Sequence, residues 1–126
     1  NDLDIKMSIY KRISLITDNQ QRNHLMVELL DRFGDLPIEV ENLFKLIEIR
    51  ILCIESNINH VEFGKKGILF GFYKNQPNNP KKLLKLGFSN KKNIIIRSDQ
   101  KVFFDFNVIK KEDTFVLVRK IINLIS

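Results

Sequence analysis

The stretch INHVEFGKKGILFGFY, residues 58–73, decides the fold class of this chain. Its first part is rich in β-branched and aromatic residues and leads from Ile58 into the turn sequence Gly64-Lys65-Lys66-Gly67. A second apolar run follows and reaches Tyr73. Because two such runs are joined by a short turn that contains glycine, the stretch predicts a β-hairpin.

The residues after this hairpin predict a helix, a second hairpin and a last helix. Asn79-Pro80 is typical of an N-cap followed by the first helical residue, and Gly87 is expected to end that short helix. The later elements are predicted at residues 93–97 and 101–106 and from about Glu112 onward. Two hairpin–helix units therefore follow one another along the chain.

The residues before the first hairpin predict three helices. Apolar side chains recur at helical spacing from Leu3 to about residue 16. Asp18-Asn19 offers an N-cap for a second helix, and Gly34 lies where the left-handed residue after that helix is expected. Pro37 opens a third helix, whose broad apolar face predicts burial on more than one side.

These patterns together predict an α+β fold in a single domain over residues 1–126. An antiparallel sheet is built from the two hairpin–helix units of residues 58–126 and carries its helices on one face. The helical part, residues 1–57, is expected to pack with this sheet, because no linker separates the two parts. The 126 residues are 44 % apolar and 29 % charged, which is typical of a soluble globular chain that can bury a core.

The net charge of +6 comes from one part of the chain, since residues 58–111 alone carry +9. Basic groups interleaved with aromatic side chains can bind single-stranded nucleic acid, which makes a basic nucleic-acid-binding module the alternative function. The basic residues are Lys65, Lys66, Lys74, Lys81, Lys82, Lys85, Lys91, Lys92 and Arg97, and the aromatic residues are Phe70, Phe72, Tyr73 and Phe88. A genome rich in A and T would also explain much of this lysine content, because Ile and Asn, whose codons are also rich in A and T, are frequent as well and Ala is absent.

No catalytic motif, phosphate-binding loop or set of metal-ligand spacings is recognisable, so we expect neither an enzyme nor a cofactor in this chain. The single cysteine, Cys53, excludes an internal disulfide, is expected in the core, and predicts a reducing, cytoplasmic setting. His24 is expected on the surface and His60 in a turn or cap. No apolar run is long enough to span a membrane. The chain begins with Asn1, which indicates a piece of a longer protein.

Three charged residues share one face of the second predicted helix. Glu28, Asp31 and Arg32 follow the spacing i, i+3, i+4 beside the apolar stripe. One interpretation is a set that pairs with itself and is solvated, worth a few tenths of a kcal/mol. The other is a polar docking surface, and the spacing alone leaves both open.

Two sequence blocks resemble the C-terminal domain of bacterial transcription-repair coupling factors. They are KMSIYKRIS at residues 6–14 and VELLDRFGDLP at residues 27–37, and the likeness continues more loosely to the end of the chain. The structural residues of these blocks are Tyr10, Phe33, Gly34 and Pro37. We expect Phe33 to anchor the helix end in the core, Gly34 to permit the turn and Pro37 to start the next helix.

The resemblance implies regulation and not catalysis. In that family the parent protein is an ATP-driven DNA translocase that uses ATP and Mg²⁺ in its own motor domains and acts on DNA and on stalled RNA polymerase. The C-terminal domain docks on a UvrB-like module of the same chain and covers the surface that UvrA would bind. Glu28, Asp31 and Arg32 match the family's polar contact surface and are therefore predicted as docking residues.

Overall fold

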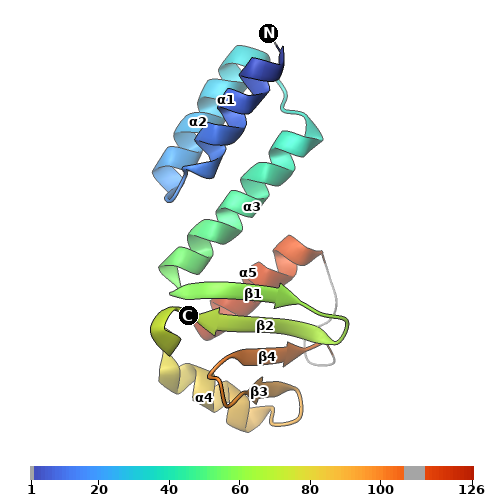
Figure 1. Ribbon diagram of the computed structural model, residues 1–126. Helices are drawn as coiled ribbons and strands as arrows, with labels where there is room; N and C mark the ends of the chain where they lie inside the picture. Colours follow the sequence, from blue (N-terminus) through green and yellow to red (C-terminus); the bar gives the residue numbers. More distant parts are fainter. Residues whose placement is uncertain (1, 107–112) are drawn as a thin grey trace. The chain divides into compact units, whose positions relative to one another are not determined.

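The chain folds into two compact units. The computed structural model describes residues 2–106 and 113–126 (Figure 1). Contacts divide the chain into Asn1–Ile51, here called the helical unit, and Leu52–Ser126, the sheet unit. The division falls within the third helix, a few residues before the change of sequence pattern at residue 57. The predicted packing of residues 1–57 with the sheet stays a prediction.

The helical unit contains α1 (Asp2–Ser14), α2 (Asn19–Phe33) and most of α3 (Ile38–Glu55), in agreement with the three predicted helices. One apolar cluster joins them, because side chains spaced by three or four residues on each helix point to a common centre. Its buried members are Ile13, Ile16, Leu25, Leu29, Phe44, Ile47 and Ile51.

The helix ends follow the cap chemistry that the sequence predicts. The Asp18 carboxylate accepts a hydrogen bond of 2.8 Å from the backbone N–H of Gln21, and so satisfies a free donor at the start of α2. Gly34 adopts φ +75° and donates its N–H to the Leu30 carbonyl at 2.9 Å. Pro37 directly precedes α3, and its carbonyl accepts the N–H of Glu41 at 3.0 Å.

Phe33 differs from its prediction, since 48 % of this residue is exposed and it does not anchor α2 in the core. The buried stripe of α2 consists of Leu25 and Leu29. Phe33 follows Leu29 by four residues and is the last residue of α2. The chain leaves the helix directly after it, at Gly34. Tyr10 of the first sequence block is likewise 43 % exposed.

The sheet unit has a four-stranded antiparallel sheet, as predicted. It contains β1 (Ile58–Phe63), β2 (Gly67–Phe72), β3 (Ile94–Ile96) and β4 (Val102–Asp105) in the order β1-β2-β4-β3. Each hairpin pairs within itself, and β2 joins the two hairpins by pairing with β4, so that Phe70 lies opposite Val102. β3 is therefore an edge strand.

One face of this sheet is apolar and covered. Ile68 and Phe70 of β2 share it with their partners Phe104 and Val102, and the four residues are at most 1 % exposed. The Phe70 and Phe104 rings meet edge to face with centroids 5.7 Å apart. The last helix, α5 (Thr114–Ile125), runs behind the sheet in Figure 1 and buries its own apolar stripe. Asp113 caps α5, and the predicted start at Glu112 lies outside the described residues.

The helix between the hairpins, α4 (Pro80–Ser89), begins as predicted but continues past Gly87. The Asn79 side chain accepts the N–H of Lys82 at 3.1 Å, and the helix closes at Asn90, whose N–H reaches the Leu86 carbonyl at 3.1 Å. A Cβ at Gly87 would lie 3.3 Å from Cδ1 of Ile96. The glycine therefore lets the helix approach β3 and does not end it.

Candidate docking surface

The predicted docking residues lie together on the solvent side of α2. Leu25 and Leu29 fix the rotation of this helix by entering the core. Glu28 is half-buried beside them, whereas Asp31 and Arg32 are exposed. The structure thus brings the three residues onto one exposed helix face, as the spacing predicts.

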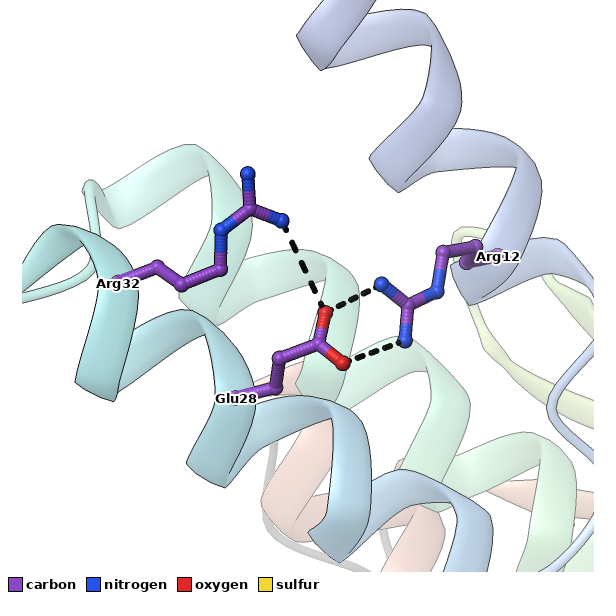
Figure 2. Close-up of polar contacts among 3 residues, drawn as sticks. All are labelled: Arg12, Glu28 and Arg32. Atoms are coloured by element: carbon purple, nitrogen blue, oxygen red, sulfur yellow. Dashed lines mark hydrogen bonds and ion pairs between the residues drawn. The ribbon is translucent and has the colours of Figure 1, made fainter.

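Arg12 of α1 joins this group. Its guanidinium forms a bidentate ion pair with the Glu28 carboxylate (Figure 2). Nη1 makes a short contact with Oε2, and Nη2 donates a hydrogen bond of 3.1 Å to Oε1. Nη1 of Arg32 lies 4.0 Å from the same Oε2. The fork geometry of arginine matches a carboxylate with two parallel bonds, which orients the Glu28 side chain. Sequence reasoning missed Arg12 because it is 16 residues from Glu28 and no local spacing connects them.

The two arginines shift the acid–base equilibria of the group. The hydrogen bond from Arg12 lowers the pKa of Glu28, and the charges of Arg12 and Arg32 act in the same direction. The carboxylate in turn raises the pKa of Arg12. Glu28 is therefore ionised wherever the protein is folded near neutral pH.

The ion pair of Arg12 and Glu28 predicts a dependence of stability on pH. Because the folded-state pKa of Glu28 lies below its unfolded value, the pair stabilises the fold above the ordinary range of glutamate, and this contribution is lost as the pH falls through the folded-state pKa. We expect Arg12→Ala to move the Glu28 pKa back toward the ordinary value, and Arg12→Lys to do so in part. Carboxyl-carbon NMR titration measures this shift. Equal titration of Glu28 in the wild type and in Arg12→Ala would contradict the pairing.

Asp31 and Arg32 differ from Glu28 in how far they are paired within the helical unit. Within residues 2–106 and 113–126 no hydrogen bond or ion pair engages the Asp31 carboxylate. Arg32 lies with its guanidinium carbon 5.0 Å from the centroid of the Phe33 ring, a cation–π contact. The self-pairing interpretation therefore holds for Glu28, which is paired within the helical unit. The docking interpretation of this face stays a prediction.

Three of the four structural residues of the two sequence blocks line a groove in the helical unit. Tyr10, Phe33 and Pro37 form part of its wall, together with the charged Lys6, Asp35 and Glu39 and several aliphatic side chains. The groove has a volume of about 500 Å³. The Tyr10 and Phe33 residues stay half exposed beside the groove, so Phe33 lines this surface and does not anchor the core as predicted.

The predicted basic surface is exposed but has lost part of its aromatic component. All five lysines of α4 and the following turn, Lys81, Lys82, Lys85, Lys91 and Lys92, are exposed. Phe70 and Phe72 are buried, whereas Tyr73 and Phe88 remain on the surface. Lys82 is not free, because its Nζ donates to the Ser126 carbonyl at 2.9 Å. The alternative function in nucleic-acid binding has therefore lost two of the four rings that supported it.

The other candidate groups occupy ordinary positions. Cys53 is half-buried, less than predicted, and burial raises the pKa of its thiol, which disfavours the reactive thiolate. His24 is exposed, and Nε2 of His60 lies 3.8 Å from Glu62. In the part of the chain that the structure describes, no three His, Cys, Asp or Glu side chains gather as a metal site would require. No helix among those same residues has the length and apolar character needed to span a membrane.

The fold is that of a known class of domain. A crystal structure of the C-terminal domain of a transcription-repair coupling factor superposes on it with a TM-score of 0.69, covering 94 % of this chain and 76 % of that one, at 22 % identity. Residues 1–83 match the family model of the TRCF domain, and the chain belongs to this family.

Whole proteins of this kind are similar over most of the chain. The transcription-repair-coupling factor of Rickettsia bellii (strain RML369-C) is 34 % identical over 104 residues, which are 82 % of this chain and 9 % of that protein. The transcription-repair-coupling factor of Haemophilus influenzae (strain ATCC 51907 / DSM 11121 / KW20 / Rd) is 33 % identical over 105 residues, again 9 % of its length. The chain thus spans only a small part of these relatives.

Proposed function

We propose that this chain is a non-catalytic regulatory domain of a transcription-repair coupling factor, an ATP-driven DNA translocase of DNA repair. It docks through Glu28, Asp31 and Arg32 on a UvrB-like module of the same protein and thereby masks the surface that UvrA binds. Membership in the TRCF domain family supports the assignment. The observation that carries the docking role is the exposed α2 face, on which Arg12 fixes Glu28 and Asp31 stays available.

The chemistry of this face suits a contact that must open. Exposed ion pairs are each worth less than about 1 kcal/mol, so a few of them close an interface without locking it. Orientation of Glu28 by Arg12 reduces the side-chain entropy that is lost on docking. Tethering within one chain then raises the effective concentration, which lets a weak polar contact hold a closed state. RNA polymerase and DNA are partners of the parent protein under this proposal, and ATP with Mg²⁺ belongs to its motor.

The test is the affinity of the full-length parent protein for UvrA. In the triple variant Glu28→Ala, Asp31→Ala, Arg32→Ala we expect at least about tenfold tighter binding, because the apparent dissociation constant falls in proportion to the fraction of unmasked protein. The side chains are exposed or half-exposed, so the fold should stay intact, which thermal melting of the 126-residue chain checks.

A matched control uses the same helix away from this face. His24→Ala replaces another exposed residue of α2 and should leave the affinity for UvrA unchanged. Unchanged affinity in the triple variant would refute the masking role. Equal gains in the triple variant and in His24→Ala would indicate a general loosening of α2 and would also count against a specific contact.

A further inference from the structure

We propose that the groove between α4 and β3 binds an acidic peptide that carries a large apolar side chain. This groove, here called the α4–β3 groove, uses none of the residues assigned to docking above. It is lined by Leu84, Gly87, Phe88, Lys91, Ile94, Ile95 and Ile96 and has a volume of about 290 Å³. The alternative function inferred from the sequence is nucleic-acid binding by a basic surface that includes Lys91. The lining of the groove favours a different ligand.

The groove exposes apolar side chains from both of its elements. Phe88 is 71 % exposed, more than any other large apolar residue in the described parts of the chain, and Leu84 lies one helical turn before it. Across the groove lies the edge strand β3, where Ile96, which is 40 % exposed, brings its side chain next to Gly87. Its neighbour Ile95, 45 % exposed, also belongs to the lining, although the alternation along a strand directs its side chain to the other face. A patch of apolar residues gathered around one hollow is typical of a binding site and not of scattered surface exposure.

Gly87 lines the groove without a side chain of its own. A Cβ on this residue would lie 3.3 Å from Cδ1 of Ile96, so a side chain at this position would press on the Ile96 side chain and take up space beside β3. The absence of a side chain at position 87, between Leu84 and Phe88, thus leaves room for a group that enters from outside. The space is suited to one large apolar side chain.

The charge around the groove selects an acidic partner. Residues 80–98 contain six basic side chains and no acidic one. Lys91 lines the groove itself, with Nζ 5.9 Å from the centroid of the Phe88 ring, and Lys81 precedes Leu84 by one helical turn. Arg97 already pairs with Asp99 at 2.9 Å. The remaining positive charge is not neutralised within residues 80–98, so carboxylates that flank an apolar anchor would be attracted to it.

The backbone of β3 favours a peptide over other acidic ligands. Ile95 lies opposite Phe103, and Arg97 donates its N–H to Lys101, so the alternation of antiparallel pairing turns the peptide groups of Ile94 and Ile96 away from β4. The Ile94 N–H reaches Asn90 at 2.9 Å, which leaves the Ile96 N–H and two carbonyls at the edge. An extended peptide can add to such an edge through its own main chain.

A nucleic acid fits the groove less well. Base recognition without sequence preference uses aromatic platforms, and Phe88 is the only ring in the lining. The aliphatic side chains of the lining, among them Leu84 and Ile96, offer no surface on which a base can stack. They contribute binding free energy when a ligand buries apolar carbon against them. Lysine ammonium groups attract carboxylates and phosphates alike. The apolar lining is therefore the feature that favours an acidic peptide over a nucleic acid.

Fluorescence anisotropy of the 126-residue chain tests the proposal with three labelled probes. The first is a short peptide of alternating acidic and large apolar residues, the second is the same peptide with serine at each apolar position, and the third is oligothymidylate. We expect the first peptide to bind at least about tenfold more tightly than the serine peptide, since one buried large side chain contributes more than about 1.4 kcal/mol.

Matched variants locate the binding. Phe88→Ala should weaken the first peptide about tenfold, as expected of a central apolar anchor. Tyr73→Ala is the control, because Tyr73 is also exposed and also carries a lysine near its ring, with Lys74 Nζ at 5.5 Å. Lys85→Gln with Lys91→Gln should weaken binding and reduce its dependence on salt, whereas Lys65→Gln with Lys66→Gln should change neither.

Several outcomes would overturn the proposal. Equal affinity for the two peptides would show that charge alone acts, and tighter binding of oligothymidylate would favour the nucleic-acid alternative. If no peptide binding is seen up to about 1 mM, the dissociation constant lies above that value and the binding free energy is smaller than about 4 kcal/mol. Such an interaction would be too weak for a docking site. Equal losses in Phe88→Ala and Tyr73→Ala would place the contact outside the groove. None of these results depends on whether the α2 face masks UvrA.

Discussion

Replacing Gly67 by alanine is expected to cost the sheet unit about 3 kcal/mol of stability, because there is no room for a side chain at this position. A Cβ built on Gly67 would lie 2.1 Å from the backbone oxygen of Phe104 and 2.6 Å from Cζ of Phe103. The Phe103 ring can rotate, but the carbonyl belongs to β4, which is paired with β2 at this point. Relief of the clash therefore requires the two strands to separate where they join the two hairpins.

The matched control for this prediction is Gly64→Ala. Gly64 lies at the other end of the same turn, where a Cβ would come within only 3.6 Å of the Gly67 carbonyl, an ordinary contact. Neither residue has a positive φ, so alanine is not strained by the backbone at either position. Thermal and urea unfolding followed by circular dichroism should show a fall in melting temperature of roughly 10 °C for Gly67→Ala and little change for Gly64→Ala. Similar stability of the two variants would contradict the close packing of β2 on β4.

The two glycines show how far the sequence can predict this fold. The GKKG turn indicates a hairpin, and the structure confirms the hairpin. The sequence assigns both glycines to the turn, however, because a turn is the local reason for glycine. The reason for Gly67 is a carbonyl 37 residues away along the chain, and no local pattern reports it. Gly87 follows the same rule, since its close neighbour Ile96 belongs to the next strand.

The candidate site shows the same limit. Helical spacing places Glu28, Asp31 and Arg32 on one face, and that prediction is confirmed. The partner that orients Glu28 is Arg12, on a different helix, and it enters only when α1 and α2 are brought side by side. Local periodicity therefore predicts which residues share a face, whereas ion pairs between elements need the tertiary structure. Whether the α2 face binds a UvrB-like module stays a prediction.

Phe44→Ala is expected to produce the largest loss of stability in the helical unit, about 4 kcal/mol. Phe44 is 2 % exposed and belongs to the central apolar cluster with Leu29, Ile47 and Ile51. Truncation removes most of a large side chain and leaves a cavity, because the close-packed side chains around it relax only in part. A free-energy change of this size is a large fraction of the total stability of a small domain, so Phe44→Ala should unfold α1 and α2 at moderate temperature.

Phe33→Ala separates this effect from the removal of an aromatic ring as such. The sequence predicts Phe33 as the core anchor of α2, whereas the structure leaves it 48 % exposed with Arg32 over its ring. We therefore expect a loss below about 1 kcal/mol for Phe33→Ala, as for most surface substitutions. Urea unfolding of the two variants, followed by the helical signal of circular dichroism, measures the difference. A larger loss for Phe33→Ala than for Phe44→Ala would restore the sequence-based assignment of the core, and would mean that α2 packs its C-terminal turn inward.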